Sequence, residues 1–208
     1  MGTSDKFIMP LYKMYLKSLI KSNILNTKSV RIAWLGQQNP ESNPIGNLGM
    51  FNQLKDLFDE SCTHDLFDIK NNPSWDVQKK WNNIKNYDVV LNLRLNYLVN
   101  SVSHLLEETK KAINNNGIYV TDFCSGNVER SFMNQTIGWK GKNQNLVAHL
   151  PRHWNTENDL SYLNPIAPSE DNILTENKLK DFGLAINHYH SYVCPKNRLN
   201  VIGVIEEL

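Results

Sequence analysis

The sequence predicts an α/β fold with a mostly parallel sheet, helices on both faces and a C-terminal antiparallel strand hairpin. The pattern of residues 87–127 indicates a strand, a helix and a second strand, the unit from which parallel sheets are built. Residues 30–58 read as strand, loop and helix. Residues 184–205 read as two strands joined by a short turn, which pair antiparallel.

The segment 87–127 gives the clearest local pattern. Residues 88–93 are apolar and β-branched over the length of a strand, as expected for a strand buried on both faces. Apolar or small side chains then recur at helical spacing, at Val102, Leu105, Leu106, Thr109 and Ile113. Gly117 is expected to stop this helix, because glycine adopts the left-handed conformation without penalty, and residues 118–123 form the next strand.

The N-terminal residues 1–28 are predicted to form a helical extension of one α/β domain that spans residues 29–208. Within the extension, residues 10–25 have the pattern of an amphipathic helix. Its lysines recur four apart and form one basic stripe, Lys13, Lys17 and Lys21. The stripe is either a solvated face or a surface for phosphate or a membrane.

A candidate ligand site follows the first strand. Residues 30–35 form this strand, which ends at Gly36, and a polar loop leads to a helix that ends near Phe58. In parallel sheets, nucleotide-type ligands bind outside the carboxyl end of a strand and near the helix N-terminus. An ordinary strand-to-helix connection is the alternative. Residues 61–69 are a second strand, with Asp65 and Asp68 near its end.

The remaining elements follow from the same signals. Residues 73–84 are predicted to form a short helix, and residues 175–182 a helix that Gly183 stops. Residues 125–170 form a loop-rich insertion, a kind of segment that is often functional. The insertion carries a group of cationic and aromatic side chains, His149, Arg152, His153 and Trp154.

The two histidines of the insertion are the candidate general bases, because histidine titrates near neutral pH. Hydrogen bonds within the loop are the alternative role for each. His149 and His153 have the spacing of two metal ligands on a helix, but Pro151 lies between them and no glutamate accompanies them, so no metal site is predicted.

The composition limits the classes of partner and the cellular compartment that we expect. Lys and Arg number 22 against 21 Asp and Glu, so no global charge favours nucleic acid. No apolar run approaches the ~20 residues of a membrane-spanning helix. The three cysteines are odd in number and far apart, which favours a reducing compartment, and no stretch resembles a signal peptide. We therefore expect a cytoplasmic protein.

Three stretches resemble the class I S-adenosylmethionine-dependent methyltransferases. YDVVLNLRLNYLV (87–99) is similar to the family's fourth strand and following loop, and GIYVTDFCSGN (117–127) to its fifth strand. LKDFGLAINHYHSYVCPKNRLNVIGVI (179–205) resembles its closing helix and hairpin. The resemblance implies a Rossmann-like fold, S-adenosyl-L-methionine as cofactor and methyl transfer to an acceptor.

The resemblance also implies site residues. The cofactor would lie over the ends of the first, second and fourth family strands, at Gly36, Gln37, Asp68 (with Asp65 as the second choice), Asn92, Leu93 and Arg94. Tyr97, Arg152 and Trp154 would bind the acceptor, with His149 or His153 as the base. Two positions depart from the family pattern, since Trp34 stands in place of an acid and Gln38 in place of a glycine.

The sequence therefore favours a methyltransferase acting on a small-molecule or sugar-like acceptor. The two departures motivate an alternative, a methyltransferase-fold protein without catalysis that serves as a binding or scaffold subunit for a protein partner. A sugar-nucleotide-using transferase is a third hypothesis, against which the terminal hairpin argues.

Overall fold

The computed structural model describes residues 3–37, 49–68, 72–73, 75–93, 95, 101–127, 148–149, 173–174, 176–194 and 198–208. The helices are α1 (Thr3–Lys21), α2 (Met50–Leu54), the 3-10 helix η2 (Lys55–Leu57), α3 (Val102–Ala112) and α5 (Glu176–Asp181). The strands are β1 (Arg31–Leu35), β2 (Thr63–Phe67), β3 (Tyr87–Asn92), β4 (Ile113–Asn127), β5 (Ala148–His149), β6 (Ile173–Leu174), β7 (Leu184–Cys194) and β8 (Arg198–Glu207).

The sheet is parallel over β2, β1, β3 and β4 and antiparallel at its C-terminal end. β1 pairs parallel with both β2 and β3, and β3 pairs parallel with β4. β8 lies between β4 and β7 and is antiparallel to both. The strand–helix–strand unit and the terminal hairpin predicted from the sequence are therefore confirmed.

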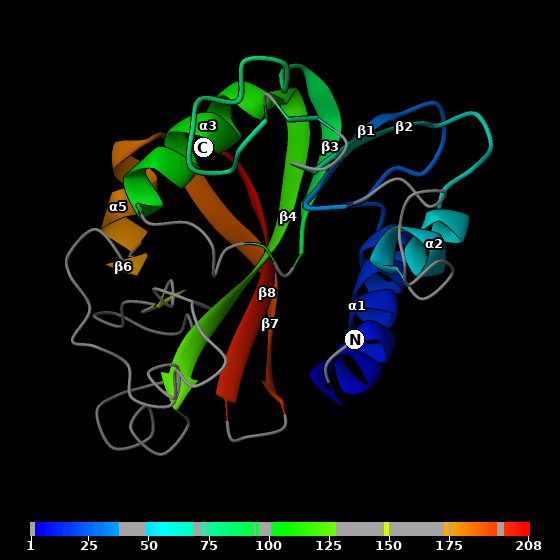
Figure 1. Cartoon of the computed structure of the whole chain (residues 1–208), viewed down its shortest axis with the longest axis horizontal. Helices are drawn as coiled ribbons and strands as arrows, with labels where there is room; N and C mark the ends of the chain where they lie inside the picture. The colour runs from blue at the N-terminus through cyan, green and yellow to red at the C-terminus, as the bar shows by residue number, and fades with distance from the viewer. Residues whose placement is uncertain are drawn as a thin grey trace.

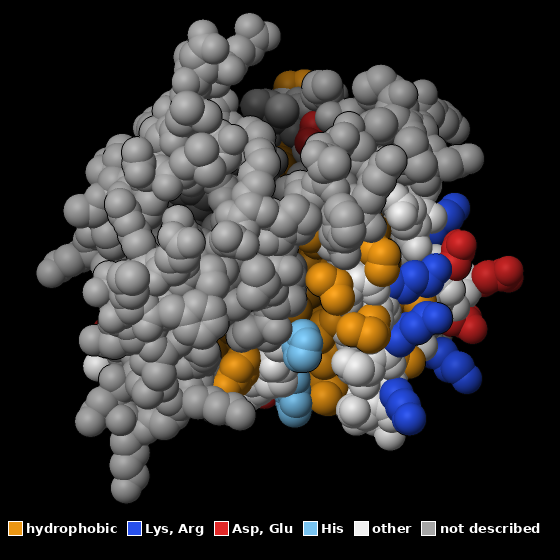
Figure 2. Space-filling model, turned by 90° about the horizontal axis from the view of Figure 1, so that it is seen from below, with side chains coloured by type: hydrophobic (Ala, Val, Ile, Leu, Met, Phe, Trp, Pro, Cys, Tyr) orange, Lys and Arg blue, Asp and Glu red, His pale blue; other side chains and the backbone are white. Residues whose placement is uncertain are grey.

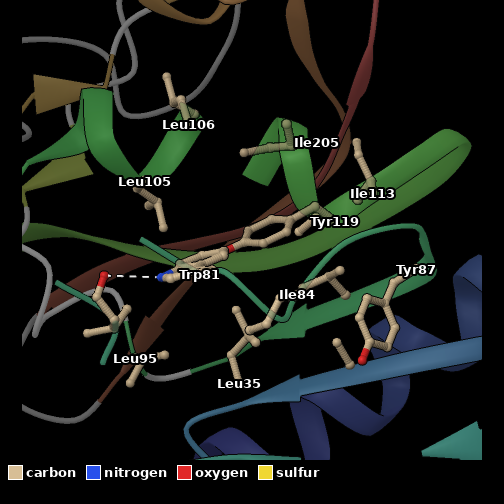
Figure 3. Close-up of a cluster of buried hydrophobic side chains, with 14 of the residues drawn as sticks. Leu35, Trp81, Ile84, Tyr87, Leu95, Leu105, Leu106, Ile113, Tyr119 and Ile205 are labelled. Atoms are coloured by element: carbon tan, nitrogen blue, oxygen red, sulfur yellow. Dashed lines mark hydrogen bonds between the residues drawn. The ribbon is translucent and has the colours of Figure 1, made fainter. Parts of the chain in front are cut away.

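Each face of the sheet packs against helices (Figure 1). Alternate residues along the strands point to opposite faces. One face carries Leu35 and Tyr119 in a core shared with α3 and α5, and Figure 3 shows Leu35, Tyr119 and Ile205 gathered near Leu105 and Trp81. The opposite face carries residues of the same strands, Trp34 and Val120 among them, in a core shared with α1 and α2.

The N-terminal helix is longer than predicted and belongs to the core. α1 begins at Thr3 and contains Pro10, with Tyr12 fully buried. The Tyr12 hydroxyl donates a hydrogen bond of 2.6 Å to Asp122 Oδ2 of β4, and the Tyr15 hydroxyl donates one to the backbone oxygen of His188 in β7. These bonds fix α1 across the C-terminal half of the sheet.

The outer face of α1 carries the predicted basic stripe. Lys13, Lys17 and Lys21 are exposed, and Met14 is 58% exposed beside them. Figure 2, seen from below the view of Figure 1, shows lysine or arginine side chains gathered beside hydrophobic ones. In the described part of the chain, no helix is both long and apolar enough to span a bilayer.

Two predicted elements are wrong in detail. The described residues of 73–84 form turns instead of a helix: the amides of Lys79 and Ile84 bond three residues back, to Asp76 and Trp81. The Trp81 amide donates instead to Glu108 Oε2 of α3 at 2.5 Å. α3 ends at Ala112 and not at Gly117, and β4 begins at Ile113.

The early start of β4 creates an irregularity in the ladder. Tyr87 pairs with Ile113, but Val89 pairs with Ile118, so β4 holds extra residues at this point. Gly117 lies in the irregularity, where an added Cβ would stand 2.6 Å from the Tyr87 backbone oxygen. Close backbone approach, and not a helix stop, explains this glycine. Gly183 does follow α5 with φ +68°, as predicted.

Candidate functional site

The candidate site is the edge of the sheet where β1, β2 and β3 end. These strands end at Leu35, Phe67 and Asn92, and all three run in the same direction. The residues that follow them therefore meet at one edge, the place where open α/β sheets bind ligands.

The turn after β1 is held tightly against β2. Gly36 has φ +69°, and its amide donates a 2.6 Å hydrogen bond to the Phe67 backbone oxygen. The Gln37 amide donates to the same oxygen at 3.3 Å, and the Gln37 side chain accepts from the Phe51 amide at 3.4 Å. The Leu95 side chain covers this turn, since a Cβ at Gly36 would lie 2.9 Å from Leu95 Cδ1; the positive φ is what favours glycine here.

Of the two candidate acids on or directly after β2, only Asp68 lies at this edge. It directly follows Phe67, and its backbone oxygen accepts a 2.8 Å hydrogen bond from the Asn72 amide. Asp68 therefore stands beside the Gly36 turn, because Gly36 bonds to the last residue of β2.

Asp65 is engaged toward the other end of the strands. Its Oδ2 accepts from the Tyr87 hydroxyl at 2.7 Å and from Arg31 Nη2 at 3.1 Å. Arg31 and Tyr87 are the first residues of β1 and β3. Burial raises the pKa of Tyr87 well above its usual range, and the bond to Asp65 adds to the shift. This geometry gives Asp65 a structural role.

The residues at the end of β3 point into the two cores. Asn92 is fully buried, and its Nδ2 donates to the Tyr119 hydroxyl on the α3 side of the sheet. Burial raises the pKa of Tyr119, which keeps the phenol protonated. The Leu93 side chain joins the core on the α1 side. The next candidates, Arg94 and Tyr97, lie outside the described residues.

The short strand β5 brings His149 to the same edge. Cys124 of β4 pairs with Asn200 of β8 on one side and with His149 on the other. Earlier along β4, this second side is paired with β3. Asn92 pairs with Thr121, so the backbone of His149 lies beyond the carboxyl end of β3. The structure describes only its backbone, and Arg152, His153 and Trp154 lie outside the described residues.

Trp34, at the position where the resemblance implies an acid, is a packed aromatic side chain. Trp34 is buried, with its ring centroid 5.1 Å from that of Phe51 and 5.9 Å from that of Phe58. Its indole N–H donates to His64 Nδ1 at 3.0 Å. Burial and the nearby Lys55 lower the pKa of His64, which matches its acceptor role toward the indole. No sequence signal had marked this cluster.

Among the described residues, this edge carries the Asp68 carboxylate beside a glycine turn. A carboxylate accepts hydrogen bonds only, so Asp68 suits a ligand with hydroxyl donors such as the ribose of a nucleoside. The Gly36 and Gln37 amides already donate to Phe67, and they are not additional donors toward a ligand in this arrangement. The residues present therefore fit the ribose part of a nucleoside cofactor.

No family model and no curated protein sequence matches the chain. Among solved structures, the CMeT domain of citrinin polyketide synthase is similar over 95% of this chain and 52% of its own, at 9% identity and a TM-score of 0.52. The chain has the class I methyltransferase fold. At this identity the likeness establishes the fold alone.

Two further structures align over most of the chain with lower scores. A S-adenosylmethionine-dependent methyltransferase from Aquifex aeolicus covers 98% of this chain and 99% of its own at 9% identity and a TM-score of 0.45. Magnesium protoporphyrin IX methyltransferase from Synechocystis, with S-adenosylhomocysteine bound, covers 96% and 83% at 9% identity and a TM-score of 0.46.

Proposed function

We propose that the chain is a S-adenosylmethionine-dependent methyltransferase acting on a small-molecule or sugar-like acceptor. The observation that carries the proposal is the placement of Asp68 beside the Gly36 turn at the carboxyl edge of a sheet with the methyltransferase fold. The near balance of 22 basic and 21 acidic residues supports an acceptor other than a nucleic acid.

The proposed roles follow from position and chemistry. Asp68 accepts hydrogen bonds from the ribose hydroxyls, and Gly36 keeps the turn beside it compact. Asn92 and Leu93 hold the end of β3 in the two cores, so that the chain after it crosses Gly36. Arg94 directly follows and is proposed to pair with the ligand's carboxylate. S-adenosylmethionine supplies, when bound, an activated methyl group on a sulfonium.

The acceptor side is proposed to come from the insertion. The backbone of His149 lies beyond the end of β3, which supports a role for this histidine, or for His153, in removing a proton from the acceptor hydroxyl or amine. Arg152 and Trp154 are its neighbours in the sequence and are proposed to orient the acceptor, together with Tyr97.

Calorimetry with S-adenosylmethionine and S-adenosylhomocysteine tests the cofactor site. We expect micromolar binding to the full chain and a loss of about tenfold or more in Asp68→Asn, because a charged hydrogen-bond acceptor is replaced by a neutral amide. Glu60→Gln is the matched control, since Glu60 is an exposed acid in the turn before the same strand. No heat with either ligand, in protein shown to be folded, contradicts the proposal.

Measurements of turnover distinguish a residue that acts as the acceptor base from a residue that binds the cofactor. His149→Ala or His153→Ala is expected to lower turnover by about a hundredfold, in the range of general-base catalysis, with cofactor affinity nearly unchanged. Unchanged turnover in both variants excludes the histidines from the reaction.

A second candidate function is a binding or scaffold subunit that lacks catalysis. It is favoured by the closed turn after β1, where the Gly36 and Gln37 amides bond to Phe67 and Leu95 covers the glycine. A folded protein that gives no heat with either ligand and retains a protein partner supports this candidate.

A further inference from the structure

A tryptophan that follows β2 lies against the proposed cofactor edge. The chain after Asp68 folds back in two steps, since the Asn72 amide donates to the Asp68 oxygen and the Trp75 amide to the Asn72 oxygen, both at 2.8 Å. Trp75 therefore returns to the end of β2, with its ring centroid 6.2 Å from that of Phe67, the residue before Asp68. Trp75 is 7% exposed.

The indole N–H of Trp75 is buried and has no hydrogen-bond partner. Its Nε1 has less than 1 Å² of exposed surface. The other two tryptophans of the described part of the chain donate. Trp34 donates to His64 at 3.0 Å. Trp81 donates to the Val77 oxygen at 3.3 Å, and Figure 3 shows Trp81 with this bond as a dashed line. Buried polar groups are nearly always paired, because an unpaired donor loses its hydration without compensation. A donor left unpaired beside a candidate site indicates that a ligand supplies the acceptor.

We propose that Trp75 Nε1–H donates a hydrogen bond to a ribose hydroxyl of the nucleoside that Asp68 binds. This inference rests on the proposed function and adds a binding residue to the same site. A hydroxyl both donates and accepts, whereas a carboxylate only accepts and an indole N–H only donates. One ribose hydroxyl that donates to Asp68 and accepts from Trp75 gives the Trp75 indole the acceptor that it lacks.

Binding also has to open the surroundings of Trp75. Since Nε1 is shielded before binding, a ligand atom reaches it only when the covering side chains move. The emission of this indole therefore changes on binding. Trp81 keeps its bond to Val77 and contributes an unchanged background.

The test compares Trp75→Phe with Trp81→Phe in the full chain by calorimetry and tryptophan fluorescence. We expect S-adenosylhomocysteine to bind about tenfold more weakly to Trp75→Phe, the loss of about one hydrogen bond. Trp81→Phe should bind within about twofold of the unchanged chain and retain the fluorescence response. The 2′,3′-dideoxy analogue of the ligand should bind the unchanged chain and Trp75→Phe equally, because it lacks the hydroxyls.

The outcomes separate this inference from the proposed function. If the unchanged chain binds S-adenosylhomocysteine and Trp75→Phe binds it equally well, the role of Trp75 is wrong and the proposed function stands. If the folded, unchanged chain binds neither ligand, both are wrong. Where Trp75→Phe fails to fold, β-(3-benzothienyl)alanine at position 75 replaces only the N–H by sulfur and keeps the ring volume, and the same tenfold loss is required of it.

Discussion

Gly117→Ala tests the irregular pairing between the start of β3 and β4. A Cβ at this position would lie 2.6 Å from the Tyr87 backbone oxygen and 2.9 Å from both the backbone nitrogen and the Oδ1 of Asn114. Two of these three atoms belong to the backbone, so no side-chain rotation relieves the contact. The ladder between β3 and β4 has to shift instead.

Overpacking of this kind costs about 1–3 kcal/mol of unfolding free energy, and the backbone contacts place Gly117→Ala at about 2–3 kcal/mol. For a chain of this size the melting temperature should fall by about 5–10 °C. Thermal unfolding by circular dichroism measures the change. Asn115→Ala is the matched control, because Asn115 is exposed two residues away, and its effect should stay within about 0.5 kcal/mol. Equal melting temperatures for the two variants refute the pairing described here.

Three further variants test contacts around the site. Tyr12→Phe should lower the unfolding free energy by about 1–3 kcal/mol in urea titrations, because the buried Asp122 loses a 2.6 Å hydrogen bond; an unchanged midpoint contradicts this contact. Asp65→Asn should lower the unfolding free energy by about 1 kcal/mol, because the hydrogen bond from the Tyr87 hydroxyl is weakened. An unfolding free energy equal to that of the unchanged chain would show that this bond contributes nothing. Folding lowers the pKa of His64, so as the pH falls the imidazole is protonated in the unfolded chain before it is protonated in the folded chain. The unfolding free energy should therefore decrease below about pH 6.5. In His64→Gln the urea midpoint should depend less on pH in that window, and an identical slope in both proteins refutes the assignment.

The sequence predicted the sheet well, because its strands are continuous apolar runs with strong local signals. Residues 88–93 lie in β3 or directly after it, and the hairpin follows Gly183. The prediction was wrong where contacts distant in the sequence decide the conformation. Within the turns of residues 75–84 the Trp81 amide bonds to Glu108 of α3, and Gly117 lies in the strand close to the Tyr87 backbone oxygen.

The candidate site was predictable in part. The resemblance ranked Asp68 ahead of Asp65, and the strand register supports that order: Ala33 pairs with Asp65, and the last residue of β1 pairs with Phe67, directly before Asp68. Strand alternation does explain the direction of the Asn92 side chain. Asn92 lies two residues after Val90, on the same face of the sheet, and this face packs against α3. The position of Trp75 follows from two turns after Asp68, and no periodicity in the sequence marks them.

A crystal structure of the chain with S-adenosylhomocysteine would test the proposed cofactor site. We expect the ligand at the carboxyl edge of β1 and β2, with its ribose hydroxyls within about 3 Å of the Asp68 carboxylate. A ligand bound elsewhere on the molecule, or an empty edge at saturating ligand, would contradict it.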